Sequence, residues 1–204
     1  MSRRNLCALL AAIILSLVAC GSTPPSDYYV LAARSGDTPT GDTPSVGVGP
    51  ISIPEYLNRN SMVFNRDGNT LEIATFARWA EPLESGISRV LSLNLAANLN
   101  TEDIQVFPWH PTRAPDYAVG VRLLGLDSNK RRAQLVAEWS LRTGGAEATE
   151  MRRIVRLEKT NGADALTPND VAATYSELLG ELSDIIAKAI ADDMSMPAAA
   201  ENPN

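Results

Sequence analysis

Cysteine and histidine are nearly absent from this chain, which limits the chemistry that it can perform. The 204 residues include two cysteines and one histidine. Cys7 lies in an apolar N-terminal segment and Cys20 stands at its end. The domain that follows contains no cysteine, so it has no thiol for a disulfide, a metal site or a nucleophile. The sequence also lacks a P-loop, an EF-hand loop and a Gly-x-Ser-x-Gly elbow. We therefore expect no cofactor, no metal site and no enzymatic activity.

His110 is the one residue that keeps a catalytic alternative open. It lies between Trp109 and Pro111 in a proline-rich loop. A Ser-His-Asp triad could use this histidine, so an envelope hydrolase remains an alternative function. A surface position in the loop is the favoured interpretation. Glu81 and Glu84 are likewise interpreted as complementing a helix dipole rather than as paired catalytic carboxylates.

Long hydrophobic runs are scarce as well. The clearest run, residues 6–18, is shorter than the roughly 20 residues that a transmembrane helix needs. Arg3 and Arg4 precede it, and Leu17-Val18-Ala19-Cys20 ends it. A positive start, a short apolar segment and small residues before a cysteine are typical of a bacterial lipoprotein signal peptide. An ordinary secretory signal that happens to end in cysteine is the alternative.

The lipoprotein interpretation divides the chain into four parts. We predict that residues 1–19 are cleaved, that Cys20 is acylated, and that residues 20–26 form a tether. A single domain over 27–193 and a disordered tail over 194–204 complete the chain. Two or more acyl chains anchor a protein stably, and Gly21 after the cysteine, in place of aspartate, favours the outer membrane.

Basic residues are too few for nucleic-acid binding. Removal of Arg3 and Arg4 with the signal leaves 16 basic residues against 24 acidic ones, a formal charge of −8. Such an acidic chain is a poor binder of phosphate backbones, because that affinity depends on clustered lysine and arginine. We therefore expect no nucleic-acid partner, and anchoring by acyl chains rather than by charge.

Hydrophobic periodicity predicts an α+β domain. Alternating residues indicate a meander of three strands, and apolar residues three and four positions apart indicate two amphipathic helices. Pro50 confines its strand to a sheet edge or marks a bulge, and Asp67-Gly68 predicts a hairpin. We expect an antiparallel or mixed sheet with both helices on one face. The expected strands are 27–31, 46–53, 61–65, 70–75, 104–107, 116–127, 132–142 and 150–158; the helices are 82–99 and 168–192; residues 34–45 are a flexible loop.

A tryptophan between charged residues marks the segment before the first helix. Arg78-Trp79 precedes Ala80-Glu81-Pro82. Tryptophan and arginine are favoured anchors of protein interfaces, so these two residues are candidate assembly contacts. The alternative is that Trp79 wedges the preceding hairpin against the helix. The basic clusters 130–132 and 152–153 are interpreted as solvated charge.

Several blocks resemble the PqiC/YmbA-type auxiliary lipoproteins of ABC-type transport systems. They are residues 28–31 (YYVL), 46–59 (VGVGPISIPEYLNR) and 78–83 (RWAEPL), with 116–119 and 137–141 in addition. The resemblance covers nearly the whole chain after Cys20. Asn58 departs from the aspartate of the family pattern, and Asn60-Ser61-Met62 departs from a more usual Pro-Gln-Ile.

The resemblance implies a function that composition does not reveal. It implies an outer-membrane lipoprotein that faces the periplasm and serves a lipid-transport system which maintains the cell envelope. The implied partners are an MCE-domain protein that spans the periplasm and further copies of the chain in a homo-oligomeric ring. Pro54, Tyr56 and Arg59, in the loop of residues 53–59, join Arg78 and Trp79 as candidate assembly contacts. A solute-binding lipoprotein of an ABC importer is the second alternative.

Overall fold

The computed structural model describes residues 24–110, 112–144, 149–160 and 166–195. The signal peptide, Cys20 and most of the predicted tail lie outside these residues. Within them the chain forms two α-helices and two mixed β-sheets, so the predicted α+β single-domain fold is confirmed. No helix among these residues is long and apolar enough to cross a membrane.

The larger sheet has five strands in the order β5-β2-β6-β7-β8. Its strands are β2 (Val46–Ser52), β5 (Ile104–Val106), β6 (Tyr117–Ser128), β7 (Arg132–Thr143) and β8 (Glu150–Thr160). The last three form the predicted antiparallel meander. β2 runs parallel to both β5 and β6, which makes the sheet mixed.

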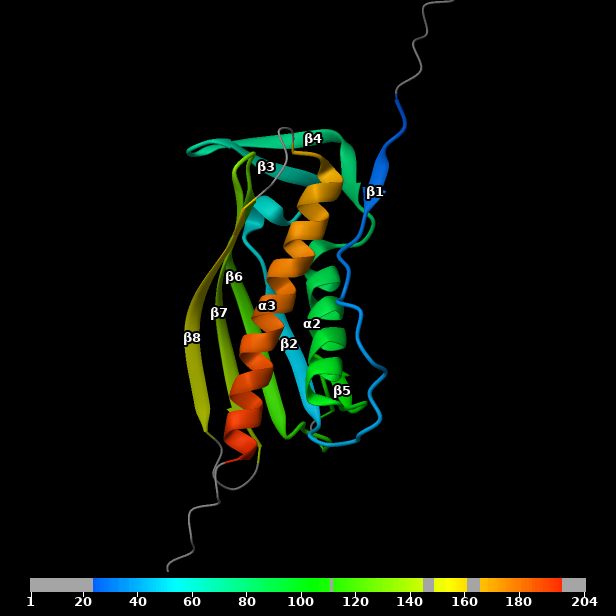
Figure 1. The fold of residues 1–204 in the computed structure, drawn as a ribbon, viewed down its shortest axis with the longest axis vertical. Helices are drawn as coiled ribbons and strands as arrows, with labels where there is room; N and C mark the ends of the chain where they lie inside the picture. The colour runs from blue at the N-terminus through cyan, green and yellow to red at the C-terminus, as the bar shows by residue number, and fades with distance from the viewer. Residues whose placement is uncertain (1–23, 111, 145–148, 161–165, 196–204) are drawn as a thin grey trace, which may run out of the picture.

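Two helices cover one face of this sheet, as predicted (Figure 1). Helix α2 spans Leu83–Leu99 and helix α3 spans Pro168–Met194. Thr167 caps α3 in a capping box with Asp170, and Pro168 occupies the first turn, where its missing N–H costs nothing. α2 ends at Asn100, whose backbone is left-handed with φ 51°. Local sequence signals therefore place the start of α3.

The smaller sheet lies across one end of the molecule (Figure 1). Its order is β1-β4-β3, from β1 (Asp27–Tyr29), β3 (Ser61–Asp67) and β4 (Thr70–Trp79). β3 and β4 form the hairpin predicted from Asp67-Gly68, and Gly68 adopts the positive φ of 55° that such a turn requires. β1 pairs in parallel with the last three residues of β4. A short 3-10 helix, η1 (Glu55–Leu57), links β2 to this end.

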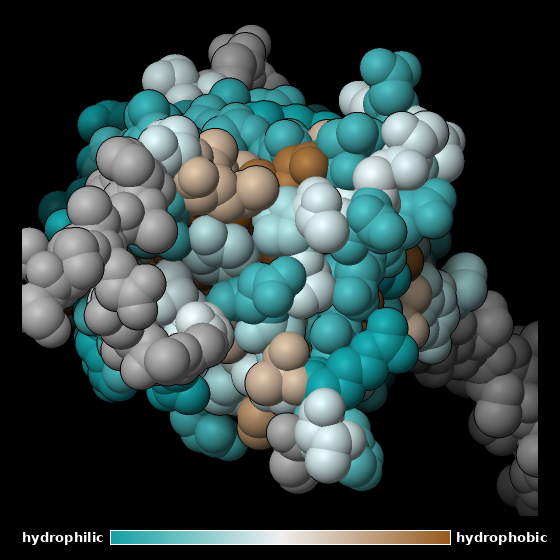
Figure 2. Space-filling view, turned by 90° about the horizontal axis from the view of Figure 1, so that it is seen from below, coloured by the Kyte–Doolittle hydropathy of each residue, from teal (hydrophilic) through white to brown (hydrophobic). Residues whose placement is uncertain are grey.

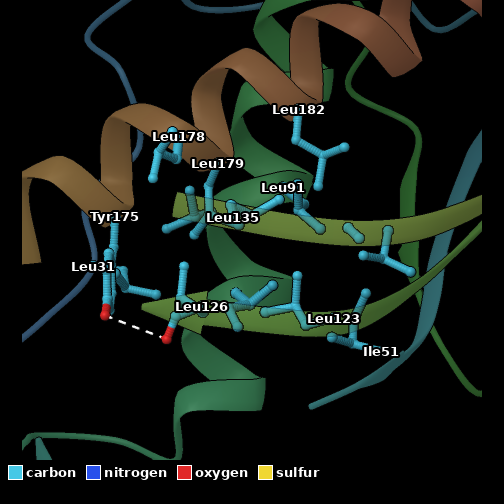
Figure 3. Close-up of a cluster of buried hydrophobic side chains, with 14 of the residues drawn as sticks. Leu31, Ile51, Leu91, Leu123, Leu126, Leu135, Tyr175, Leu178, Leu179 and Leu182 are labelled. Atoms are coloured by element: carbon cyan, nitrogen blue, oxygen red, sulfur yellow. Dashed lines mark hydrogen bonds between the residues drawn. The ribbon is translucent and has the colours of Figure 1, made fainter. Parts of the chain in front are cut away.

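The core lies between the helices and the five-stranded sheet. Leu178, Leu179 and Leu182 of α3 point toward Leu123 and Leu135 of the sheet (Figure 3). These leucines are almost completely buried, and each contributes about 1.5–3 kcal/mol by leaving water. Because the described residues include no cysteine that could form a disulfide, this apolar packing is their main source of stability.

Two details differ from the sequence interpretation. The loop of residues 34–45, expected to be flexible, is held against the helices: the Arg34 amide donates to Asn94 and the Gly41 amide to the carbonyl of Asn100. Pro50 marks a bulge, as one alternative predicted, but its strand is central at Val46–Val48, where β5 and β6 flank it. A strand as short as β5 leaves no sequence signal strong enough to reveal its parallel partner.

Candidate functional site

Three of the five predicted assembly residues, Arg59, Arg78 and Trp79, lie in segments that meet at the smaller sheet. Ser61 at the start of β3 pairs with Arg78 of β4, and the Trp79 amide donates to the carbonyl of Asn60 over 2.7 Å. These contacts bring the loop of residues 53–59, which ends at Arg59, beside Arg78 and Trp79. We call this region the anchor-proximal end, because the first described residues, which follow the predicted anchor, enter it through β1.

Trp79 is a core residue. Its side chain is 7% exposed and stacks on Tyr175 of α3, with ring centroids 6.4 Å apart. The indole therefore packs the end of the hairpin onto α3. The buried indole fits the alternative in which Trp79 wedges the hairpin against a helix. The helix that it contacts is α3, however, and not α2, which follows Trp79 in sequence.

Arg78 holds the incoming chain. Its Nε donates to the Ser26 hydroxyl over 3.2 Å, and Tyr28 lies opposite it in the parallel β1–β4 ladder. The Ala80 amide donates to the carbonyl of Tyr29 over 2.9 Å. Together these contacts fix the segment directly after the predicted tether. The role of Ser26 was not foreseen, because a single serine in a polar stretch carries no distinctive signal.

The loop of residues 53–59 presents a mixed surface. Pro54 and Tyr56 are half-buried and Arg59 is exposed. The carbonyl of Pro54 accepts from the amide of Leu57, which closes η1. Arg59 is therefore the most accessible of the predicted contacts, while Pro54 shapes the turn that presents it.

Tyr56 belongs to a small polar network that sequence reasoning missed. The Leu126 amide lies 3.5 Å from its hydroxyl, and the Tyr175 hydroxyl donates to the Leu126 carbonyl over 3.4 Å (Figure 3). Burial and then the neighbouring Asp127 raise the pKa of Tyr56. Burial also raises the pKa of Asp127, against a hydrogen bond from Tyr56 that lowers it. The network joins the loop, β6 and α3 at the anchor-proximal end.

Asp127→Asn is expected to stabilise the protein at neutral pH. Because the folded-state pKa of Asp127 is raised above its usual 3.8, the folded state holds this proton more tightly than the unfolded state does. Stability is therefore lost as pH rises from about the unfolded pKa through the folded one. Asparagine keeps an acceptor for Tyr56 without the charge, so the free energy of unfolding at pH 7 should rise. The gain is at most about 1 kcal/mol, because solvent screens a half-buried charge.

Urea denaturation of the Asp127→Asn variant and the unaltered chain, at pH 3 and pH 7, measures this effect. The difference should nearly vanish at pH 3, where the carboxyl is protonated in both states. Asp42→Asn, at an exposed position, is the matched control and should show no pH-dependent gain. A destabilised Asp127→Asn at pH 7 would contradict the prediction.

The residues of the catalytic alternatives make local contacts. His110 is exposed, and its Nδ1 lies 2.8 Å from the Thr112 hydroxyl. Glu81 pairs with Arg89, which also donates to the carbonyl of Leu31 over 2.8 Å. Across the described ranges no group of three or more His, Cys, Asp or Glu residues could hold a metal ion.

A family model decides the classification of the chain. The model for the ABC-type transport auxiliary lipoprotein component matches residues 29–187. The chain belongs to this family. Membership confirms the resemblance seen in the sequence, and it identifies the protein as an auxiliary lipoprotein with an accessory role in transport. A search of curated proteins gives no match.

Solved structures confirm the fold of this auxiliary lipoprotein. A crystal structure of an uncharacterized protein superposes with a TM-score of 0.61 at 21% identity, and covers 84% of this chain and all of its own. A Xanthomonas campestris protein assigned to the DUF330 family superposes with a TM-score of 0.62 at 12% identity, and covers 83% of this chain and all of its own. At such low identity, these likenesses establish the fold alone.

Proposed function

We propose that this lipoprotein is anchored in the outer membrane through Cys20, faces the periplasm, and serves as an accessory component of an MCE-type lipid-transport system. The observation that carries the proposal is the family match over residues 29–187, which follows directly on a lipoprotein signal ending at Cys20. Its role is to bind other proteins rather than to catalyse a reaction, and it assembles into a homo-oligomeric ring.

The fold supports an anchored position. Ser26 is held by Arg78, and only residues 21–25 separate it from Cys20. At about 3.3–3.6 Å per residue, this link spans roughly 20 Å when fully extended. The domain thus stays close to the membrane, with the β3–β4 hairpin and β1 nearest to it.

Arg59 is the proposed contact for the MCE-domain partner. It is exposed at the anchor-proximal end, next to the start of β3, which pairs with Arg78. Within the described residues Arg59 forms no ion pair with a carboxylate, which leaves its charge available for a partner. A solute-binding importer lipoprotein usually has two lobes, whereas this fold is one domain.

Affinity capture from detergent-solubilised envelopes, followed by mass spectrometry, tests the partner. We expect an MCE-domain protein to be recovered with the unaltered chain and severalfold less with the Arg59→Glu variant. Arg113→Glu is the matched control, because Arg113 is exposed on the loop before β6. That loop lies at the far end, where the Tyr117 hydroxyl donates to Asp193 near the end of α3. Recovery of no MCE-domain protein in several detergents would overturn the proposal.

A further inference from the structure

Large apolar side chains are exposed on the elements nearest the anchor. Tyr28 of β1 is 66% exposed, and Leu71, Ile73 and Phe76 of β4 are 40%, 52% and 37% exposed. We call these four residues the apolar rim. Isolated exposed hydrophobic residues are ordinary, but a group on one sheet indicates a surface that leaves water in the working protein.

The backbone of the smaller sheet explains how the rim is displayed. The pairing of β3 with β4 is irregular between Ile73 and Arg78, and β4 bends there, so that its first half crosses the end of the molecule (Figure 1). Leu71 and Ile73 lie two residues apart on that crossing part and share a face. Phe76 lies two residues before Arg78, the ladder partner of Tyr28, so Phe76 and Tyr28 share a face beside the incoming chain.

The opposite end has a different character. Figure 2 views the molecule from that end, where most of the coloured surface is hydrophilic or neutral and hydrophobic residues form small separate spots. Tyr175, beneath the hairpin, and Asp193, at the far end, are 18 residues apart on α3. At 1.5 Å per residue they are roughly 27 Å apart. The apolar rim thus lies at the end where the chain leads to Cys20.

The position and composition of the rim point to one occupant. We propose that the apolar rim rests on the lipid surface into which Cys20 is anchored, so that the acyl chains and the β3–β4 hairpin hold the domain at two places. The link of residues 21–25 keeps Ser26, directly before β1, within roughly 20 Å of the bilayer. Tyrosine suits this boundary because its ring is apolar and its hydroxyl is polar. The inference rests on the proposed lipid anchor.

The predicted mature chain has no free thiol, so a thiol-reactive fluorophore labels only an introduced cysteine. The full-length lipidated protein carrying Ile73→Cys receives an environment-sensitive fluorophore at that position, and is placed in vesicles of phosphatidylethanolamine and phosphatidylglycerol. Ile154→Cys is the matched control, because Ile154 is also a strand isoleucine, 68% exposed, on β8 of the larger sheet. We expect a blue-shifted emission at position 73, and at least twofold stronger quenching by brominated lipid there than at position 154.

Each outcome has one meaning. Vesicle flotation first reports whether the protein is anchored at all, so loss of flotation would refute the proposed anchor rather than the rim. Flotation with equal quenching at positions 73 and 154 would overturn the inference. Shielding of the fluorophore at position 73 that persists in detergent and increases with protein concentration would show that a second copy covers the rim. That result would also overturn the inference.

Discussion

Cys20→Ser is expected to move the protein from the membrane fraction to the soluble fraction almost completely. The serine hydroxyl cannot accept the thioether-linked lipid, so the variant lacks the acyl chains that hold the domain stably on a membrane. The apolar rim is too small to hold the domain alone, since even one myristoyl chain binds membranes only weakly and reversibly. Fractionation of cells followed by immunoblotting measures the shift.

A second cysteine supplies the control for this prediction. Cys7 lies within the signal segment, so Cys7→Ser should be processed, acylated and retained like the unaltered chain. A Cys20→Ser protein that stays in the membrane fraction after a high-salt wash would refute acylation as the anchor. Retention that disappears on washing would instead indicate weak adsorption of the domain.

Trp79→Ala is expected to lower the free energy of unfolding by about 3–5 kcal/mol, the usual cost of truncating a buried aromatic residue. The indole is almost fully enclosed and stacks on Tyr175, so alanine would leave a cavity between the hairpin and α3. Domains are commonly stable by only 5–15 kcal/mol, so this is a large part of the total. Urea denaturation followed by circular dichroism measures the loss.

Trp79→Phe separates a structural role from an assembly role. Phenylalanine keeps an aromatic ring against Tyr175, so its loss of stability should be clearly smaller than that of alanine. An alanine variant with an unchanged unfolding midpoint, but with lost recovery of partner proteins, would contradict the structural assignment. It would show that Trp79 acts in assembly alone.

Local patterns were enough to predict the helices and the meander. Thr167, Pro168 and Asp170 indicate the start of α3. The alternation from Ala133 to Leu141 correctly separates the buried from the more exposed face of β7. These features depend on neighbours in sequence. The parallel partners of β2 and β1 were not predicted, because pairing between distant segments depends on packing that no local pattern records.

The candidate site was predicted only in part. The contacts of Asn60 and Ser61 with β4 bring the segment that contains Arg59 to Arg78, whereas Trp79 is buried against Tyr175. Tyr56 and Asp127 meet across 70 residues of sequence, and the perturbed pKa of each depends on burial that becomes visible only in the fold. Sequence composition limits thiol chemistry, because the only cysteines are Cys7 and Cys20, but it cannot locate a network of this kind.

The parallel pairing of β1 with β4 has a mechanical consequence. If the proposed anchor at Cys20 holds the domain, tension from a bound partner enters the fold through Asp27–Tyr29, the first strand. Because β1 and β4 run in the same direction, a pull along the chain shears their hydrogen bonds together with the Ser26–Arg78 contact. Beyond the strand, Leu31 is buried in the core and its carbonyl accepts from Arg89. We therefore expect β1 to separate from β4 under load before the core is disrupted.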